Sequence, residues 1–194
     1  MPPKSKVTRD MIVNAAVEIA REAGAEAINA RAVAQKLNCS TQPVMYHFAT
    51  MDELKRAAYS RTDDFHTEYL MNCSGCKNPL LEIGLNYIRF AIAEPCLFRF
   101  LFQSGYAEEN SLPEMIDSEN LTPLLSAMQE WLGMDMDNIK DVFLTVALFT
   151  HGYASIIANN TLEFDEALVA AHLERALKGA VIAVSQEENN EEVL

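Results

Sequence analysis

The amino-acid sequence predicts an all-α protein of about nine helices. Three observations support this fold class. Apolar residues recur every three or four positions over most of the 194 residues, as they do on the buried face of a helix. The seven glycines and seven prolines lie mostly between these periodic segments, where they begin or end helices. No stretch alternates apolar and polar residues for long enough to predict a strand.

Each of the first four expected helices begins at a residue that can cap a helix. These residues are Thr8, Asn29, Ser40 and Thr50. Gly24 is placed to end the first helix, and the third helix runs over residues 41–48 with Pro43 in its first turn. Glu53 follows Thr50 by three residues and completes a capping box for the long fourth helix.

Longer helices are expected in the rest of the chain, at positions 78–94, 96–104, 121–132, 137–160 and 165–184. Asp137 and Asp165 can cap the last two, and Gly133 can end the helix before them. The polar residues 106–120 are expected to form a loop. The acidic residues 185–194 are expected to form a disordered tail.

Charge is distributed unevenly along the chain. The formal net charge is −13, yet residues 1–61 contain nine Lys or Arg residues against six Asp or Glu residues, a net charge of +3. The remaining residues therefore carry −16. Only the basic N-terminal part can approach the phosphate backbone of DNA without repulsion.

The N-terminal residues also bear on the cellular compartment. The first six residues contain no apolar stretch typical of a secretory signal, and no apolar run reaches the roughly 18 residues that span a membrane. In a chain without an export signal, four cysteines do not predict a disulfide framework. We therefore expect a cytoplasmic protein that does not bind a membrane.

The second and third expected helices are short and are separated by a tight turn at residues 37–40, as in a helix-turn-helix. In that motif the second helix enters the major groove of DNA. Here it exposes Thr41, Gln42, Tyr46 and His47. Gln can pair with adenine, the Thr methyl can contact thymine, and Tyr or His can reach phosphates. The spacing alone is equally compatible with a helical hairpin that only packs.

Four segments of this region share a distinctive pattern: Ala15–Gly24, Arg31–Leu37, Ser40–Phe48 and Met51–Leu54. In their order and gaps they resemble the TetR/AcrR family of bacterial transcriptional regulators. Residues 98–102 and 149–152 are similar to a common type of C-terminal domain in that family. The resemblance implies a DNA-binding head at 1–54, a helical regulatory and dimerisation domain at 55–184, and the tail at 185–194.

The resemblance also implies which residues contact DNA. Two are expected to contact bases or lie next to them, Gln42 and Tyr46. Four are expected to contact phosphates: Arg31, Thr41, His47 and Lys55. The chain departs from the family at Met45 and Met51, where many members carry a Tyr and a Lys that touch phosphate. The sequence-independent part of binding is therefore expected to be weakened, with Tyr46, His47, Lys55 and a basic N-terminal arm of Lys4, Lys6 and Arg9 as possible compensation. A helical interaction protein that has lost DNA binding is an alternative.

For the larger domain, the resemblance implies a homodimer and an unidentified small-molecule effector. Residues 142–149 are apolar nearly all round and the last helix is rich in alanine, so these two helices of each subunit can form a four-helix interface. Candidate effector contacts are Phe65, Tyr69, Tyr87, Arg99, Phe102, Trp131 and His151. For these residues, and for Arg89, packing in the core or an ion pair with a carboxylate of the same domain is the alternative.

Cys73 and Cys76 form a CxxC pair where the fourth helix gives way to the fifth. Such a pair can bind metal or form a redox disulfide. Cys39 and Cys96 are isolated, so neither a metal site nor a cofactor is expected, and a redox- or metal-responsive regulator stays an alternative. The sequence contains no nucleophile elbow, phosphate-binding loop or zinc-protease motif, and no enzyme is expected.

Together these expectations describe a dimeric transcriptional regulator. The sequence predicts a repressor that binds a palindromic operator in double-stranded DNA and is released from it by a small-molecule effector. Both the head and the body of the molecule are needed for this function, because the signal and the response lie in different domains.

Overall fold

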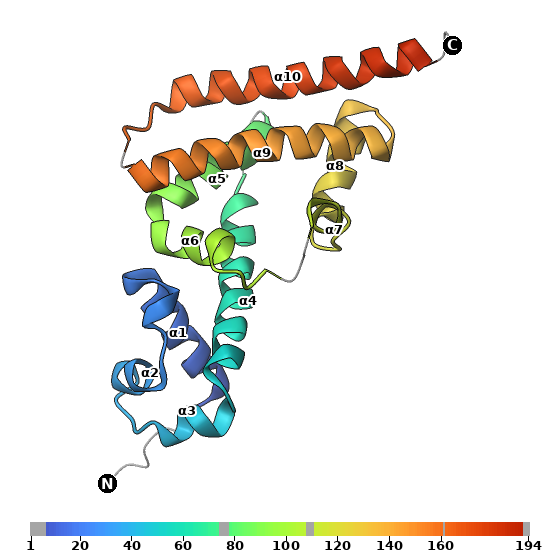
Figure 1. The fold of residues 1–194 in the computed structure, drawn as a ribbon. Coiled ribbons are helices and arrows are strands. Elements are labelled where there is room, and N and C mark those ends of the chain that lie inside the picture. The colour runs from blue at the N-terminus through green and yellow to red at the C-terminus, as the bar shows by residue number, and fades with distance from the viewer. Residues whose placement is uncertain (1–6, 74–77, 108–110, 161, 192–194) are drawn as a thin grey trace. The chain divides into compact units, whose positions relative to one another are not determined.

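The computed structural model describes residues 7–73, 78–107, 111–160 and 162–191 (Figure 1). Within these residues, all regular secondary structure is helical, with ten α-helices and one 3₁₀ helix. The all-α prediction is therefore confirmed. By its internal contacts the chain divides into two compact units, residues 1–69 with 93–107 and residues 70–92 with 108–194.

The first unit is built around the N-terminal helices. Its elements are α1 (Arg9–Ala23), η1 (Ala25–Ala27), α2 (Ala30–Lys36), α3 (Gln42–His47), most of α4 (Met51–Leu70), and α6 (Pro95–Gln103). Helix α1 buries Ile12, Ala16 and Ile19, which recur at helical spacing. The Tyr59 hydroxyl on α4 donates to the Leu101 carbonyl on α6 at 3.2 Å.

Residues from α4 and α6 thus join the first three helices, and the first unit extends past residue 54. Arg21 of α1 adds an ion pair with Glu94, at the start of α6, at 3.0 Å. These long-range contacts involve residues far apart in sequence, which local patterns do not reveal. Whether DNA binding itself needs only residues 1–54 stays a prediction.

Three of the predicted caps begin the helices for which they were expected. Thr8 Oγ1 accepts from the Met11 N–H, and Asn29 Oδ1 accepts from two N–H groups in the first turn of α2. Thr50 Oγ1 accepts from the Glu53 N–H at 3.1 Å, while the Glu53 carboxylate accepts from the N–H of residue 49 at 2.9 Å. The predicted capping box therefore forms, with the return bond one residue earlier than usual.

The cap of the third helix was predicted one residue too early. Helix α3 begins at Gln42 with Thr41 at its N-cap position, and the Thr41 side chain makes no capping hydrogen bond. Ser40 is therefore not the cap. The chain reaches α3 through Asn38, which has a φ of 50°, a left-handed conformation that Asn tolerates better than most residues. This turn fixes the position at which α3 can start.

The second unit contains the remaining helices: α5 (Pro79–Ala93, all but its last residue), α7 (Leu112–Ile116), α8 (Thr122–Leu132), α9 (Met136–Asn160) and α10 (Glu166–Glu191). Helices α9 and α10 run side by side (Figure 1). They are antiparallel, because the early residue Val142 shares a hydrophobic cluster with Ala180, whereas Tyr153 contacts His172. Leu125 and Met128 of α8 complete that cluster.

Three expectations for this unit need correction. Asp135, not Asp137, caps α9, since its carboxylate accepts from the Asn138 N–H at 3.0 Å. The stretch expected to be a loop contains α7, which Ser111 caps. Helix α10 continues to Glu191, in contrast to the disorder expected from residue 185, because glutamate and glutamine favour helix once α10 has been nucleated. The caps at Asp165 and Gly133 are confirmed.

Helix α9 is long and apolar enough to span a membrane by length and composition. This property does not by itself indicate a membrane protein, because a helix in a protein core or interface passes the same test. Here α9 packs against α8 and α10, while Leu148, Phe149 and Ile156 remain exposed. Its apolar composition therefore exceeds what the packing of one chain buries.

Candidate functional site

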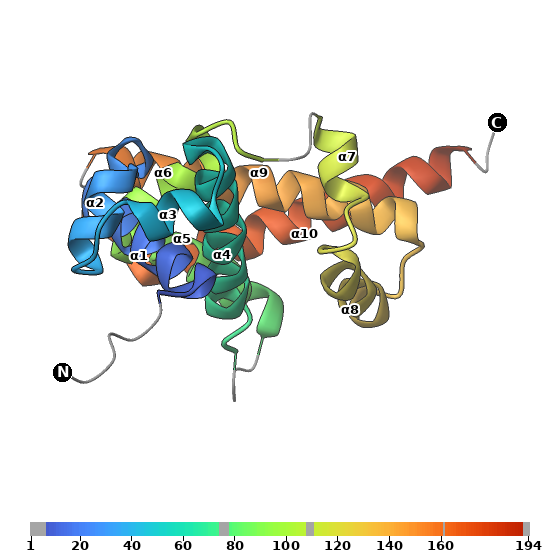
Figure 2. The ribbon, with the colours of Figure 1, turned by 90° about the horizontal axis from the view of Figure 1, so that it is seen from below.

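Helix α3 presents two chemically different faces. Val44 and Phe48 are fully buried and anchor the helix in the first unit. Gln42, Met45 and Tyr46 are exposed, and Tyr46 is 82% exposed (Figure 2, which looks onto α3). Because successive residues of a helix are rotated by about 100°, Gln42 lies at the middle of the outward face with the other two on its flanks. The sequence prediction that Gln42 and Tyr46 point outward is confirmed.

The predicted phosphate contacts have unequal surroundings. Thr41 and Arg31 are exposed, and within the described residues Arg31 has no carboxylate at ion-pair distance. Lys55 is only 15% exposed in its side chain and lies 3.6 Å from the carboxylate of Glu26. His47 is half-buried, and its Nε2 is 3.2 Å from the carbonyl oxygen of Val7.

These surroundings divide the phosphate candidates into two groups. Arg31 and Thr41 can meet a phosphate as they stand. Lys55 would first have to leave Glu26, and His47 would have to use its other ring nitrogen. The bond from His47 to Val7 also fixes the start of α1 beside α3, so His47 has a structural role that the sequence did not reveal.

Most of the basic side chains that the structure describes in the first unit have a carboxylate partner within it. Five have a carboxylate partner: Arg21, Lys36, Lys55, Arg56 and Arg61. Arg9 lies over the ring of Phe48, with its guanidinium carbon 4.8 Å from the ring centroid. This pairing leaves the net charge of +3 over residues 1–61 unchanged, but it places a carboxylate beside five of the cations that could otherwise meet a phosphate.

The seven predicted effector contacts are distributed over both units, and each unit brings some of them together. In the first unit Phe65 and Tyr69 stack edge to face with ring centroids 6.4 Å apart. In the second unit the Tyr87 hydroxyl lies 2.8 Å from His151 Nδ1. Burial raises the pKa of Tyr87 and lowers the pKa of His151, so both groups are held neutral at pH 7.

The other predicted effector contacts are more exposed or have a local partner. Phe102 is 40% exposed and packs against Phe98 at a centroid distance of 5.0 Å. Arg99 lies 3.4 Å from the sulfur of Cys96. Trp131 is 50% exposed on α8.

A hollow of about 600 Å³ lies between α9 and the first half of α10. Its lining is mostly apolar and includes Phe149, Tyr153 and Ile156, with Glu163 and Asp165 also contributing. None of the seven predicted effector contacts lines it. Sequence reasoning did not single out Tyr153 or Ile156, because it treated α9 as buried on several sides. One signal could have identified them. The segments that form α9 and α10 carry more apolar positions than the neighbouring helices of a single chain can cover.

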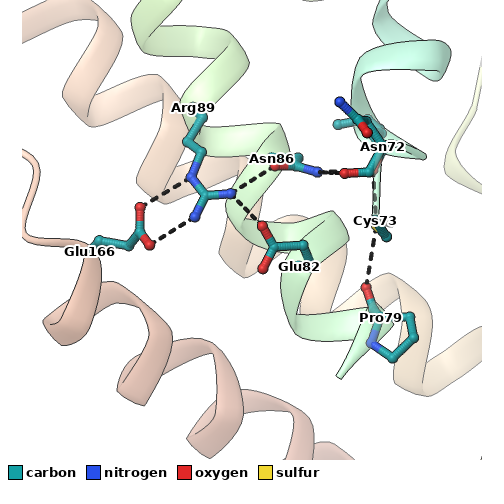
Figure 3. A network of polar contacts seen from close by, with 8 residues as sticks. Asn72, Cys73, Pro79, Glu82, Asn86, Arg89 and Glu166 are labelled. Atoms are coloured by element: carbon teal, nitrogen blue, oxygen red, sulfur yellow. Dashed lines mark hydrogen bonds and ion pairs between the residues drawn. The ribbon is translucent and has the colours of Figure 1, made fainter. Parts of the chain in front are cut away.

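A polar network in the second unit ties the end of α4 to the start of α10 (Figure 3). The Asn86 side-chain amide donates to the backbone carbonyls of Leu70 and Asn72 at 3.2 and 3.3 Å. Its oxygen accepts from Arg89, which also pairs with Glu82 at 2.5 Å and with Glu166 at 2.7 Å.

Hydrogen bonds to Glu166 and Glu82 raise the pKa of Arg89, which therefore stays charged. The ion-pair alternative for Arg89 is confirmed.

Cys73 lies three residues after the end of α4. Its thiol approaches the carbonyl oxygens of Leu70 at 3.4 Å and Pro79 at 4.0 Å. Cys76, the other half of the predicted CxxC pair, lies outside the described residues. Among the residues that the structure does describe, no cluster of three His, Cys, Asp or Glu side chains could hold a metal ion.

A helix-turn-helix with an outward-facing polar row is followed by a larger helical unit with an exposed apolar face on its last two helices. This is the organisation of a helix-turn-helix protein with a separate helical body.

Comparison with solved structures identifies the fold. A TetR-family transcriptional regulator from Streptomyces coelicolor is 16% identical, with a TM-score of 0.71 over 94% of this chain and 83% of that one. The multidrug binding protein EbrR in complex with ethidium is 17% identical, with a TM-score of 0.59 over 91% of this chain and 99% of that one. A TetR-like transcriptional regulator from Rhodococcus sp. RHA1 is 14% identical, with a TM-score of 0.56 over 91% of this chain and 96% of that one.

The chain has the fold of TetR-family transcriptional regulators, which confirms the resemblance inferred from the sequence. No protein-family model matches the chain, and no curated protein matches it.

Proposed function

We propose that the protein is a cytoplasmic, homodimeric transcriptional regulator that represses by binding a palindromic operator and leaves it when an effector binds. The observation that carries the proposal is the exposed row on α3, held by Val44 and Phe48 in the second helix of a helix-turn-helix. Tyr46 is 82% exposed, so its ring and hydroxyl group are available to a partner.

In this proposal, Gln42 and Tyr46 contact bases and the remaining predicted residues fix the register on the DNA backbone. Arg31 and Thr41 are exposed and supply the main phosphate contacts. His47 and Lys55 contribute less, because Val7 and Glu26 already engage them. Affinity therefore depends more on base contacts than on charge.

The dimer is proposed to form through α9 and α10. Their exposed apolar residues are Leu148, Phe149, Ile156, Leu168 and Ile182. A second copy that covers this face would remove these side chains from water, which stabilises the pair in proportion to the apolar area buried. Two heads related by a two-fold axis would then read two half-sites separated by about one helical turn of DNA, roughly 34–36 Å.

The effector is proposed to be a small molecule. The solved structure of EbrR with ethidium concerns a protein of the same fold, which supports this class of ligand. Candidate contacts are Phe65, Tyr69, Tyr87, Arg99, Phe102, Trp131 and His151. Helix α4 starts four residues after the end of α3, and Asn86 donates to the carbonyl of its last residue, so we propose that α4 couples DNA binding to effector binding. Coupling must be reciprocal: DNA weakens effector binding by the factor by which the effector weakens DNA binding.

Selection from a random pool of duplex DNA at moderate salt tests the proposal. The protein should enrich an inverted repeat, and the enriched duplex should bind one dimer. It then provides the probe with which small molecules can be tested for displacement. If no sequence is enriched and no duplex binds even at low salt, the head has lost DNA binding and the protein has another function.

A further inference from the structure

Met45 lies on the outward face of α3 and has no evident structural role there. It is 47% exposed, whereas its neighbour Val44 is fully buried. Exposing a large apolar side chain brings no stability to the first unit. The position at which the helix presents it is also specific, because Met45 flanks Gln42 on one side and Tyr46 flanks it on the other.

We propose that Met45 recognises the C5-methyl group of a thymine in the major groove, next to the base pair that Gln42 contacts. This inference rests on the proposed function and adds a specificity-determining residue to it. The thymine methyl is the one apolar group that a base pair exposes in the major groove, and proteins read it by apolar contact. A thioether side chain is flexible and polarisable, so it can adapt to this contact.

The chemistry of α3 favours DNA as the occupant of this face. Gln42 can make two hydrogen bonds with an adenine in the major groove, and a thymine of a neighbouring base pair exposes its methyl group in the same groove. The segment 1–61 carries a net charge of +3, whereas the rest of the chain carries −16. A nucleic acid can therefore approach this part of the molecule most easily.

The proposal is tested by removing the methyl group without changing any hydrogen bond. Each thymine of a selected operator half-site is replaced in turn by deoxyuridine, and the Kd of the full-length protein is measured by fluorescence anisotropy. At one thymine per half-site the replacement should weaken binding by the wild-type protein about fourfold, the value expected for one buried methyl group. At other thymines the change should be smaller.

Met45→Ala should remove this dependence, so that the variant binds the thymine and deoxyuridine duplexes equally well. Met45→Leu keeps an apolar side chain of similar size and should retain most of the dependence. Met11→Ala is the matched control: Met11 is 37% exposed on α1, in the same unit but not on α3. It should leave the methyl dependence intact.

The possible failures are distinguishable. If the wild-type protein selects an operator but Met45→Ala keeps the full methyl dependence, or if no thymine shows any, the inference about Met45 is wrong and the proposed function stands. If no duplex is selected at all, the proposed function fails and the inference fails with it.

Discussion

His66 links the stability of the first unit to pH. It lies on α4 with only 6% of its surface exposed, and its ring packs edge to face against Phe102 at a centroid distance of 5.5 Å. Burial lowers the pKa of His66 from 6.5 to about 4. Between these two pH values the unfolded chain binds a proton that the folded chain does not. The stability that neutral His66 provides is therefore present above pH 6.5 and is lost as the pH falls towards 4.

We expect a fall from pH 7 to pH 5 to lower the free energy of unfolding by about 2 kcal/mol through His66 alone. Urea unfolding at the two pH values measures this change. His66→Phe cannot be protonated and should lose about that much of the pH dependence, while carboxylates elsewhere account for what remains. Identical pH dependence in the two proteins would show that His66 does not titrate as its burial indicates.

Gln42 is expected to determine the preference for one base pair. Gln42→Ala should weaken operator binding by about 1–3 kcal/mol and relax the preference at a single position of each half-site. Arg31→Ala is the contrasting variant, because loss of a phosphate contact should weaken all duplexes alike and reduce the salt dependence of binding. Both effects can be read from Kd values on a panel of single-base operator variants. Uniform weakening by Gln42→Ala would rule out its assignment to a base.

At the scale of helices and turns, the polar network around Arg89 makes a measurable contribution to the second unit. Arg89 binds the Glu166 carboxylate through two nitrogens, at 3.1 and 2.7 Å. Such a bidentate ion pair is stronger than a surface pair with a single contact. Both side chains are partly exposed, so solvent screens the pair. Its strength is therefore that of a good surface ion pair.

A double-mutant cycle of Arg89→Met and Glu166→Gln should give a coupling energy of about 1 kcal/mol in low salt. The coupling should decrease in high salt, because the charges are not deeply buried. Free energies of unfolding from urea titrations of the four proteins provide the measurement. A coupling near zero in low salt would mean that the network of Figure 3 leaves stability unchanged.

Helix starts and stops were the most predictable elements, since they depend on local chemistry. Thr8, Asn29 and Asp165 each accept a backbone N–H in the first turn of the predicted helix. The misplaced caps at Ser40 and Asp137 have close alternatives nearby, Thr41 at the N-cap position and Asp135 two residues upstream. Local sequence identifies a helix start to within one or two residues, and the turn before it decides which residue becomes the cap.

For the molecule as a whole, the exposed face of α9 and α10 predicts assembly. Ile156→Glu and Leu168→Glu place charges on side chains that are 56% and 49% exposed in one chain. Each substitution should convert the dimer to monomers, because a charge is costly to bury in the interface. Analytical ultracentrifugation measures this change, and the affinity for the operator should fall as the dimer is lost. Leu112→Glu, on α7 at 46% exposure, is the matched control and should leave the dimer intact.

The sequence predicted the fold class and the outward row of α3, because both follow from periodicity along one segment. It did not predict the pairing of Lys55 with Glu26, which are 29 positions apart and meet only when α4 packs near η1. Nor did it predict the hollow between α9 and α10, which depends on how two distant helices pack. The candidate contacts with DNA could thus be chosen from the sequence. Whether each cation is free to bind a phosphate could not be predicted, because that depends on its ion-pair partners in the folded chain.

The internal neutralisation of the basic side chains has a consequence for how such a regulator would search a chromosome. A cation that stays paired with a carboxylate, as Arg56 is with Asp52, contributes less to counterion release when DNA binds. The proposed regulator would therefore dwell only briefly on unrelated sequence. With about 10⁶–10⁹ competing sites in a genome, weak retention keeps more copies free to reach the operator. Few molecules per cell would then suffice to keep a gene silent.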